Sequence, residues 1–415
     1  MTIQLCKIKN LKISAIYYIL VLILSMLNCI YLPLKVGIIS DFLMIFMVWK
    51  EGLFKNLRVK PFLLFYTVWC ILSYVWMGGN RVSGMIMSFG YTILPICFFI
   101  VGKKIDYEER KYYFRLLINV TRIMLIISLL LVILMPDFYC EYLINKSWVS
   151  DKDRFIAKIE ARMRMQGFFG ATPTGFFCAF LFLADFKQLL WREFNKKTIF
   201  FFYLDILFLM MNSRKSAILV AFLLMICEFW NYFKVKRRTA SRGAILIVIS
   251  VFLIGLLVLV ALHYGFDFKF VFDLIDRFSA AGMDKALGNR ANDNANAISH
   301  MTDYMFVVGN GFGSSGHRAD VDSGIFIFDN NIMLIFVETG IIGLFLFFCA
   351  IFENSNKVIL NKRYFSLEFY IVFLSVVQSA ASNIMENQFI TPLFFLSLGC
   401  CSNWQDCKNR GELYD

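Results

Sequence analysis

The amino-acid sequence predicts an all-α integral membrane protein that crosses the bilayer about twelve times. Hydrophobic residues make up 59% of the 415 residues and charged residues only 17%, a balance too apolar for a soluble protein of this length. A bilayer core about 30 Å thick needs roughly 20 apolar helical residues, and runs near that length recur along the chain. We therefore expect a single polytopic membrane domain over residues 1–415.

Apolar runs place the expected helices one after another along the chain. They cover residues 14–31, 34–49, 61–77, 84–102, 116–135, 168–185, 198–211, 216–233, 243–263, 326–352, 364–382 and 388–403. The tenth run is interrupted by Asp329, Asn330, Asn331 and Glu338. The first run has a basic flank like a signal peptide, but it lacks a small-residue cleavage site, so we expect it to stay as an anchor.

Lysine and arginine set the expected orientation, because cytoplasmic loops near helix ends are enriched in them. An N-terminus in the cytoplasm places the main basic stretches inside, at residues 50–60, 103–115, 192–197, 234–242 and 361–363. Both termini are then cytoplasmic, and Arg122 is expected to snorkel inward. The net charge of +12 fits anionic lipid headgroups, so membrane lipids are expected partners and nucleic acid is not.

Two long connections face the outer side in this topology. They are residues 136–167 and 264–325, and the second contains a predicted amphipathic helix at 266–282. The other connections are short. Chemistry on a bulky polar substrate is therefore expected on the outer face.

The outer face has few basic residues, and their presence there opposes the usual enrichment of lysine and arginine in cytoplasmic loops. An anion would explain them, since the planar donors of arginine match a pyrophosphate, although lipid phosphates would also satisfy some of them. We expect phosphate contacts from Arg164, Arg214 and Arg290, with Lys215 and Arg318 in support.

Four segments in a fixed order carry a resemblance. They are RMQGFFGATPTGFFCAF (164–180), NSRKSAILVAF (212–222), GNRANDNANAISHMTDYMFVVGNGFGSSG (288–316) and DNNIMLIFVETGIIGLFLFF (329–348). Their order and spacing resemble the O-antigen polymerase and O-antigen ligase superfamily, and most of all a Wzy-type polysaccharide repeat-unit polymerase. The remaining helices are similar to that superfamily in hydropathy alone.

The resemblance implies a membrane glycosyltransferase on the outer side of the bacterial cytoplasmic (inner) membrane. Its substrates are polyprenyl-pyrophosphate-linked oligosaccharides, which it joins into O-antigen (lipopolysaccharide), capsular or exopolysaccharide chains. A flippase and a chain-length regulator are the protein partners this implies. Family polymerases are similar in carrying an outer-loop arginine and a glycine at the interval of Arg164 and Gly175, but the same interval after Arg290 reaches Met301.

The ligase branch resembles this chain in its last segment but carries His-Asn about nine residues before a glutamate. Counting back from Glu338 places Asp329 and Asn330 at those positions, so a histidine-dependent ligase is disfavoured. An O-antigen ligase-type transferase and a lipid-linked oligosaccharide flippase or transporter remain the alternatives. Asn330 is expected to contact the glycan.

Glycosyl transfer also needs a base for the acceptor hydroxyl. The candidates are Asp329, which alternatively caps the following helix; His300, alternatively a surface residue; and Glu338, alternatively paired or facing the bundle interior. A pyrophosphate is already a good leaving group, so neither a metal nor another cofactor is required. The outer loops contain no histidine cluster that would hold a metal.

Gly311, Gly313 and Gly316 have the spacing of a dinucleotide fingerprint. That fingerprint needs a preceding strand and a following helix, and neither is predicted here. We expect instead a tight turn that returns the chain to the membrane, with backbone N–H groups of Gly311 and Gly313 available to phosphate as a further hypothesis.

Overall fold

The computed structural model contains only helices and connecting segments in the residues that it describes. Those residues are 42, 45–46, 49, 60–77, 82–105, 107–135, 137–139, 165, 167, 171–191, 195–212, 214–235, 288, 292, 294–315, 330–360, 366–387 and 389–403. Among them, five helices are long and apolar enough to cross a membrane. The protein is therefore a multi-pass α-helical membrane protein, as the composition predicts.

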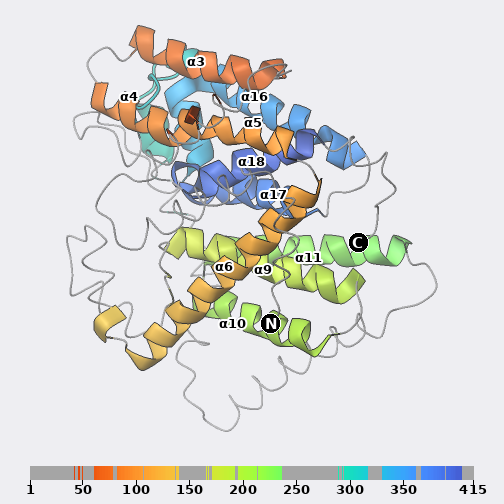
Figure 1. Ribbon diagram of the computed structural model, residues 1–415. Helices are drawn as coiled ribbons and strands as arrows, with labels where there is room; N and C mark the ends of the chain where they lie inside the picture. The colour runs from red at the N-terminus through yellow and green to blue at the C-terminus, as the bar shows by residue number, and fades with distance from the viewer. Residues whose placement is uncertain are drawn as a thin grey trace. The chain divides into compact units, whose positions relative to one another are not determined.

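The described helices belong to two compact units (Figure 1). Met1–Val120 and Gly288–Asp415 form the first, and Thr121–Leu287 the second. The first unit contains α3 (Pro61–Met77), α4 (Val82–Ser88), α5 (Cys97–Lys104), α15 (Asp303–Val308), α16 (Asn331–Leu360), α17 (Leu367–Ser379) and α18 (Ile390–Ser402). The second contains α9 (Ala171–Trp191), α10 (Lys196–Asn212) and α11 (Lys215–Val235), and α6 (Tyr107–Leu134) runs from the first unit into the second.

Most of the expected helices are confirmed where the structure describes the chain. The helix α3 has the predicted bounds, and α10, α11 and α18 begin and end within two residues of theirs. The helix α6 begins nine residues early because the basic stretch before it continues the helix. The expected helices at 14–31 and 243–263, most of 34–49, and the amphipathic helix at 266–282 lie outside the described residues.

The exposed face of α11 is apolar, as expected of a helix in contact with lipid. Leu219, Phe222, Leu223, Ile226 and Trp230 recur at helical spacing and are all exposed. Ala217, Val220, Ala221 and Leu224 on the opposite face are buried, and α11 packs against α9 there. An apolar exterior with an equally apolar packed interior is what a bilayer permits.

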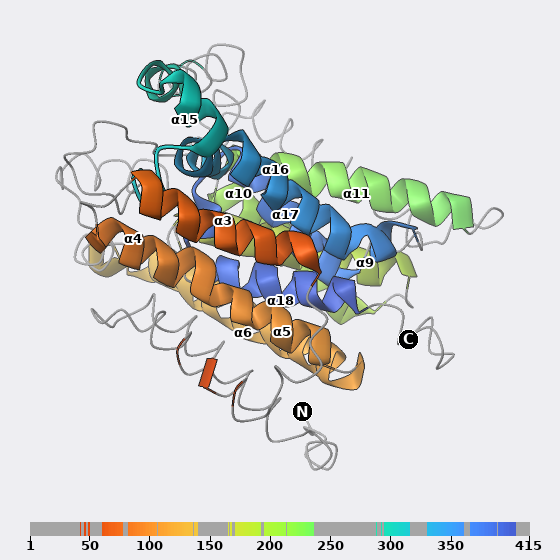
Figure 2. The ribbon, with the colours of Figure 1, turned by 90° about the horizontal axis from the view of Figure 1, so that it is seen from above.

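Two glycines let α5 and α18 approach closely within the first unit (Figures 1 and 2). A Cβ atom at Gly102 would lie 2.0 Å from the carbonyl oxygen of Leu396, and one at Gly399 would lie 2.2 Å from that of Phe99. Small residues that bring backbones together are the usual way for helices to pack in membranes. The same unit pairs α3 with α16, and these two helices hold the candidate site.

Candidate functional site

A broken helix forms the frame of the candidate site. Gly340 lies inside α16 with φ 67° and ψ −173°, so the chain leaves the helical conformation for one residue. A Cβ atom at this position would lie 2.2 Å from the carbonyl oxygen of Val307 in α15, so glycine is required by both conformation and space. The break therefore coincides with the closest approach of α15 to α16.

The break frees backbone carbonyls that other residues satisfy. The carbonyl oxygens of Val337 and Glu338 accept hydrogen bonds from the N–H groups of Asn310 at 2.7 Å and Gly311 at 3.0 Å. The carbonyl of Thr339 accepts one at 2.8 Å from the indole N–H of Trp69 in α3. In a bilayer each unsatisfied backbone group costs several kcal/mol, so these contacts stabilise the break.

The glycine-rich loop after α15 makes the tight turn that its sequence predicts. Gly309, Gly311 and Gly313 have φ values of 87°, 96° and 81°, which side chains disfavour. A Cβ atom at Gly309 would lie 2.3 Å from the Glu338 carbonyl, and one at Gly313 would lie 2.8 Å from the backbone of Gly84. The turn is therefore pressed between α16 and the start of α4.

The amides of this turn donate hydrogen bonds to protein acceptors. Besides the Gly311 N–H, the N–H of Phe312 donates to the hydroxyl of Ser73 at 3.2 Å, and that of Ser315 donates to Glu338 Oε1 at 3.2 Å. The described part of the loop is buried. Gly311 and Gly313 thus act through their conformation here, and a phosphate contact by their amides stays a prediction.

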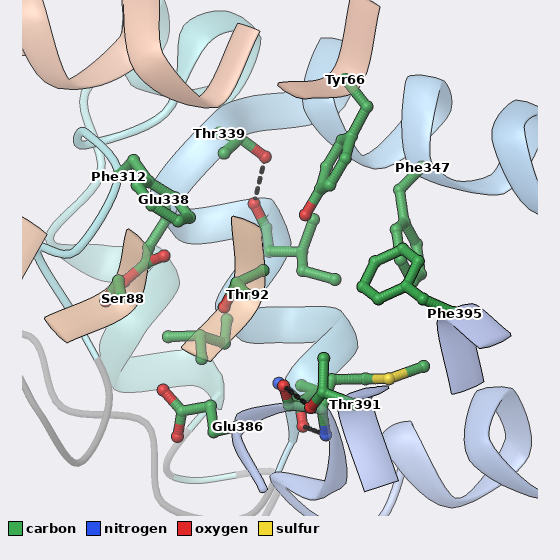
Figure 3. A pocket seen from close by; sticks show the side chains of 14 residues that line it. Tyr66, Ser88, Thr92, Phe312, Glu338, Thr339, Phe347, Glu386, Thr391 and Phe395 are labelled. Carbon is green, nitrogen blue, oxygen red and sulfur yellow. Dashed lines mark hydrogen bonds between the residues drawn. The ribbon is translucent and has the colours of Figure 1, made fainter. Parts of the chain in front are cut away.

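Glu338 is buried and lines a small cavity together with a second carboxylate, Glu386 (Figure 3). The hydroxyl groups of Tyr66, Ser88 and Thr92 line the same cavity. Its volume of about 30 Å³ has room for one or two water molecules, far less than a sugar ring needs. Glu338 is thus placed to hold the loop rather than to contact a sugar in this conformation.

Irregular helices supply the lining of this cavity. Ser88 ends α4, and Thr92 belongs to a π-helical segment, Phe89–Ile93, that is followed by a 3-10 turn, Leu94–Ile96. Glu386 belongs to the 3-10 turn η5 (Ile384–Glu386). Interrupted helices in membrane proteins are tolerated where they line a cavity or are buried in protein, and they commonly mark functional sites.

Two asparagines organise the start of α16. The side-chain oxygen of Asn330 accepts a hydrogen bond from the N–H of Met333 at 3.0 Å, which makes Asn330 the N-cap of α16. The side-chain oxygen of Asn331 accepts from the N–H of Met385 at 2.8 Å and so positions the turn that carries Glu386. Asp329, the expected alternative cap, lies outside the described residues, as do Arg318 and Gly316.

His300 lies apart from the buried carboxylates. It is exposed at the end of a short helix, with its Nδ1 atom 2.7 Å from the carbonyl oxygen of Asn296. The buried face of that helix packs Ala297 and Met301 against Val337, the neighbour of Glu338. The structure therefore anchors the helix of His300 on α16 while leaving the imidazole accessible.

A second cluster, in the second unit, surrounds the expected cationic pair. Arg214 immediately precedes α11, and Lys215 begins it. The amide group of Asn212 donates to the carbonyl oxygens of Met165 at 3.0 Å and Ala171 at 3.1 Å. The N–H of Met165 in turn donates to the carbonyl of Met211 at 3.1 Å. The residue next to Arg164 is thereby tied to the turn that carries Arg214.

Gly175 completes this cluster by its lack of a side chain. A Cβ atom there would lie 2.7 Å from the side-chain oxygen of Asn212 and 3.1 Å from Cβ of Arg214. The glycine singled out by its interval from Arg164 therefore packs against the turn with the cationic pair. Arg164 and Arg290 themselves lie outside the described residues.

Sequence reasoning missed two groups of ionisable residues. Glu386 lies in the short connection between the last two predicted helices, where a lone carboxylate belongs to no motif. Asp185 and Asp205 lie inside helices and pair with Arg122, whose guanidinium is buried, so the expectation that Arg122 snorkels inward is wrong. Arg122, Asp185 and Asp205 are each an isolated charge inside an apolar run. Three such charges in neighbouring membrane helices indicate that they pair with one another.

The described residues thus define a multi-pass helical membrane protein with a broken span, a glycine-rich loop docked on it, and a buried carboxylate at their junction. No model of a known protein family matches the chain, and no curated protein sequence matches it.

Proposed function

We propose that this protein polymerises polyprenyl-pyrophosphate-linked oligosaccharide repeat units on the outer side of a bacterial cytoplasmic membrane. The observation that carries the proposal is the pairing of the four segments that resemble the polymerase superfamily. The first packs on the second through Gly175 and Asn212, and the third docks on the fourth through Gly311 and Glu338. Within each pair, segments that are separated in the sequence lie together, as expected where a fold builds a functional site.

The proposed topology follows from the charge distribution. The chain crosses the membrane about twelve times with both termini in the cytoplasm, and residues 136–167 and 264–325 form the outer loops. The turn at Arg214 and the glycine-rich loop then both face the outer side, where lipid-linked glycans are polymerised.

The reaction transfers the growing glycan to the end of a new repeat unit. The bond between its anomeric carbon and the pyrophosphate oxygen breaks, and a bond forms between that carbon and an acceptor hydroxyl oxygen. The acceptor proton passes to a protein base, and polyprenyl pyrophosphate leaves. Arg164, Arg214 and Arg290 stabilise the negative charge on the leaving group, with Lys215 and Arg318 in support.

The base in this proposal is Asp329. In the sequence it directly precedes Asn330, the cap of α16. Glu338 is a positioning residue, because its carboxyl accepts from the loop and its cavity is too small for a sugar. His300, which is exposed, is the second candidate for the base.

Deletion of the gene tests the proposal. A polymerase deletion leaves surface glycan of a single repeat unit without a ladder of longer chains. Loss of all surface glycan while lipid-linked polymer accumulates would instead identify a ligase-type transferase. Lipid-linked repeat units that accumulate on the cytoplasmic face would identify a flippase. Complementation with the Asp329→Asn variant, which should reach the membrane without restoring the ladder, then tests the assigned base.

A further inference from the structure

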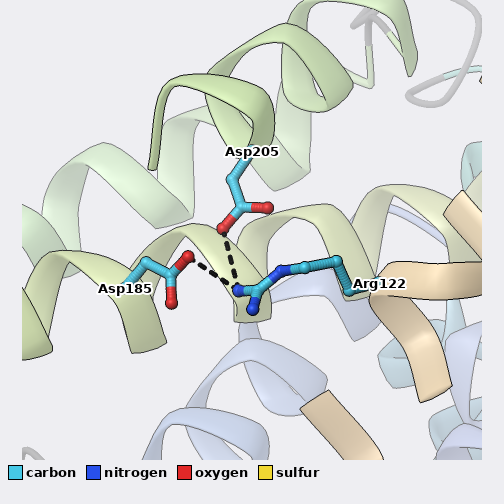
Figure 4. Close-up of polar contacts among 3 residues, drawn as sticks. All are labelled: Arg122, Asp185 and Asp205. Carbon is cyan, nitrogen blue, oxygen red and sulfur yellow. Dashed lines mark hydrogen bonds and ion pairs between the residues drawn. The ribbon is translucent and has the colours of Figure 1, made fainter. Parts of the chain in front are cut away.

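Three ionisable side chains meet inside the second unit (Figure 4). Arg122 Nη2 lies 2.7 Å from Asp185 Oδ2 and 3.7 Å from Asp205 Oδ2. The three side chains come from α6, α9 and α10 and are between 0% and 9% exposed. They lie within apolar helices and away from the helix ends, where an ionisable group is costly unless it is paired or functional.

The charges in this cluster do not balance. The close contact between Arg122 and Asp185 is a hydrogen-bonded ion pair, in which one guanidinium charge balances one carboxylate charge. Asp205 is a second carboxylate on the same nitrogen at a longer distance. If both carboxyl groups were ionised, the cluster would carry one surplus negative charge in surroundings that cannot solvate it.

Asp205 also lacks hydrogen-bond donors. It is fully buried, and neither of its carboxyl oxygens receives a hydrogen bond within the described part of the chain. A buried carboxylate normally accepts several such bonds. A protonated carboxyl group has a donor of its own, and Asp185 and Asp205 approach the same nitrogen, Arg122 Nη2. A proton shared between the two therefore resolves both the charge and the missing donor.

The other charged or titratable groups near the cluster do not supply the missing cation. From α9, the thiol of Cys178 faces Asp205, and from α10, Lys197 Nζ lies 5.8 Å from the centre of the Phe201 ring. Arg122 Cζ lies 4.2 Å from the centre of that same ring. From α11, Glu228 accepts a hydrogen bond from the indole of Trp191 at 2.7 Å. Among the described residues, Arg122 is the one cation that forms an ion pair with Asp205.

We propose that Arg122, Asp185 and Asp205 form a proton-binding site that holds one exchangeable proton between the two carboxyl groups. Asp205 carries the proton and donates it to Asp185, which also accepts from Arg122, so the bound state is neutral. A purely structural brace would need only the pair of Arg122 and Asp185. The site goes beyond the proposed glycan transfer, which uses no proton bound in this unit.

Infrared spectroscopy of the full-length protein in lipid nanodiscs at neutral pH tests the site. A carboxylic acid absorbs in a carbonyl band distinct from that of a carboxylate, and the band shifts when the proton exchanges in D2O. In each variant, the number of protonated carboxyl groups in the cluster should equal the number of its carboxyl groups minus the number of its cations. The wild type has one protonated carboxyl in this cluster, Asp205→Asn and Asp185→Asn each have none, and Arg122→Gln has two.

The control is Asp137→Asn, which changes an exposed aspartate beyond the end of α6 and should leave the band unchanged. Asp185→Asn provides a second measurement should Asp205→Asn fail to fold, since either change leaves one carboxylate facing one guanidinium. A band of equal intensity in the wild type and in either asparagine variant overturns the proposal. So does saturable binding of radioactive sodium by the wild type that either variant abolishes, because a metal cation would then occupy the place assigned to the proton.

Discussion

The carboxyl group of Glu338 accepts a hydrogen bond from the backbone N–H of Ser315 at 3.2 Å, although the two residues lie 23 positions apart. The backbone carbonyl of Glu338 accepts another from the N–H of Gly311 at 3.0 Å. One residue of a membrane helix thereby holds both ends of the buried turn. Two contacts from one residue therefore fix the turn against α16.

Substitution of Glu338 should distinguish a positioning role from a chemical one. Glu338→Gln keeps a side-chain oxygen that can accept from Ser315, so we expect it to retain most of the polymer ladder. Glu338→Ala removes the acceptor and leaves a cavity, so the ladder should be lost. Gel analysis of surface glycan in complemented deletion cells measures both. A glutamine variant that folds normally yet makes no ladder would assign Glu338 to the chemistry.

Gly313→Ala should destabilise the protein by about 1–3 kcal/mol, because the residue has a φ of 81° and an added Cβ would lie 2.8 Å from backbone atoms of Gly84. Thermal unfolding of the purified protein in detergent measures the effect. Gly288→Ala is the matched control, since a Cβ atom there meets nothing within 4 Å. Equal unfolding temperatures for the two variants would contradict the docked geometry of the turn.

The helices and the turn could be predicted from the sequence for separate physical reasons. Apolar runs report membrane helices because the bilayer leaves few other solutions, and α3 matches its predicted bounds. Glycine spacing reports positive φ, which Gly311 and Gly313 confirm. The break at Gly340 could not be predicted, because a glycine inside an apolar run is common in membrane helices.

The tertiary partners were the least predictable part of the site. Trp69 donates a hydrogen bond to the Thr339 carbonyl, and the N–H of Met385 donates one to the side chain of Asn331. Local sequence patterns predict neither hydrogen bond. The pairing of Arg122 with Asp185 is of the same kind, since orientation rules treat each charge separately while the fold brings them together. Local sequence patterns therefore predict helices and turns, whereas long-range contacts determine which polar residues pair with one another.

Trp69→Phe should weaken the broken region of α16 modestly. The change keeps most of the ring but removes the indole donor, so the Thr339 carbonyl loses the partner that lies 2.8 Å away. A hydrogen bond between membrane helices contributes roughly 0.6–2 kcal/mol, and we expect a destabilisation of that size. Unfolding by titration with a denaturing detergent measures it. Trp230→Phe, on the exposed face of α11, is the control and should have little effect.

Arg214→Ala should abolish the polymer ladder while the protein still reaches the membrane. Arg214 immediately precedes α11 beside Lys215, and the positive end of the helix dipole at this N-terminus favours a bound anion. Removing the guanidinium should therefore weaken the stabilisation of the leaving pyrophosphate. Arg290→Ala is expected to lose the ladder as well. Arg115→Ala, an exposed change on α6, is the matched control and should leave the ladder intact. Normal ladders in both the Arg214 and Arg290 variants would refute the pyrophosphate assignment. A large loss of stability in Arg214→Ala would show instead that this arginine is structural.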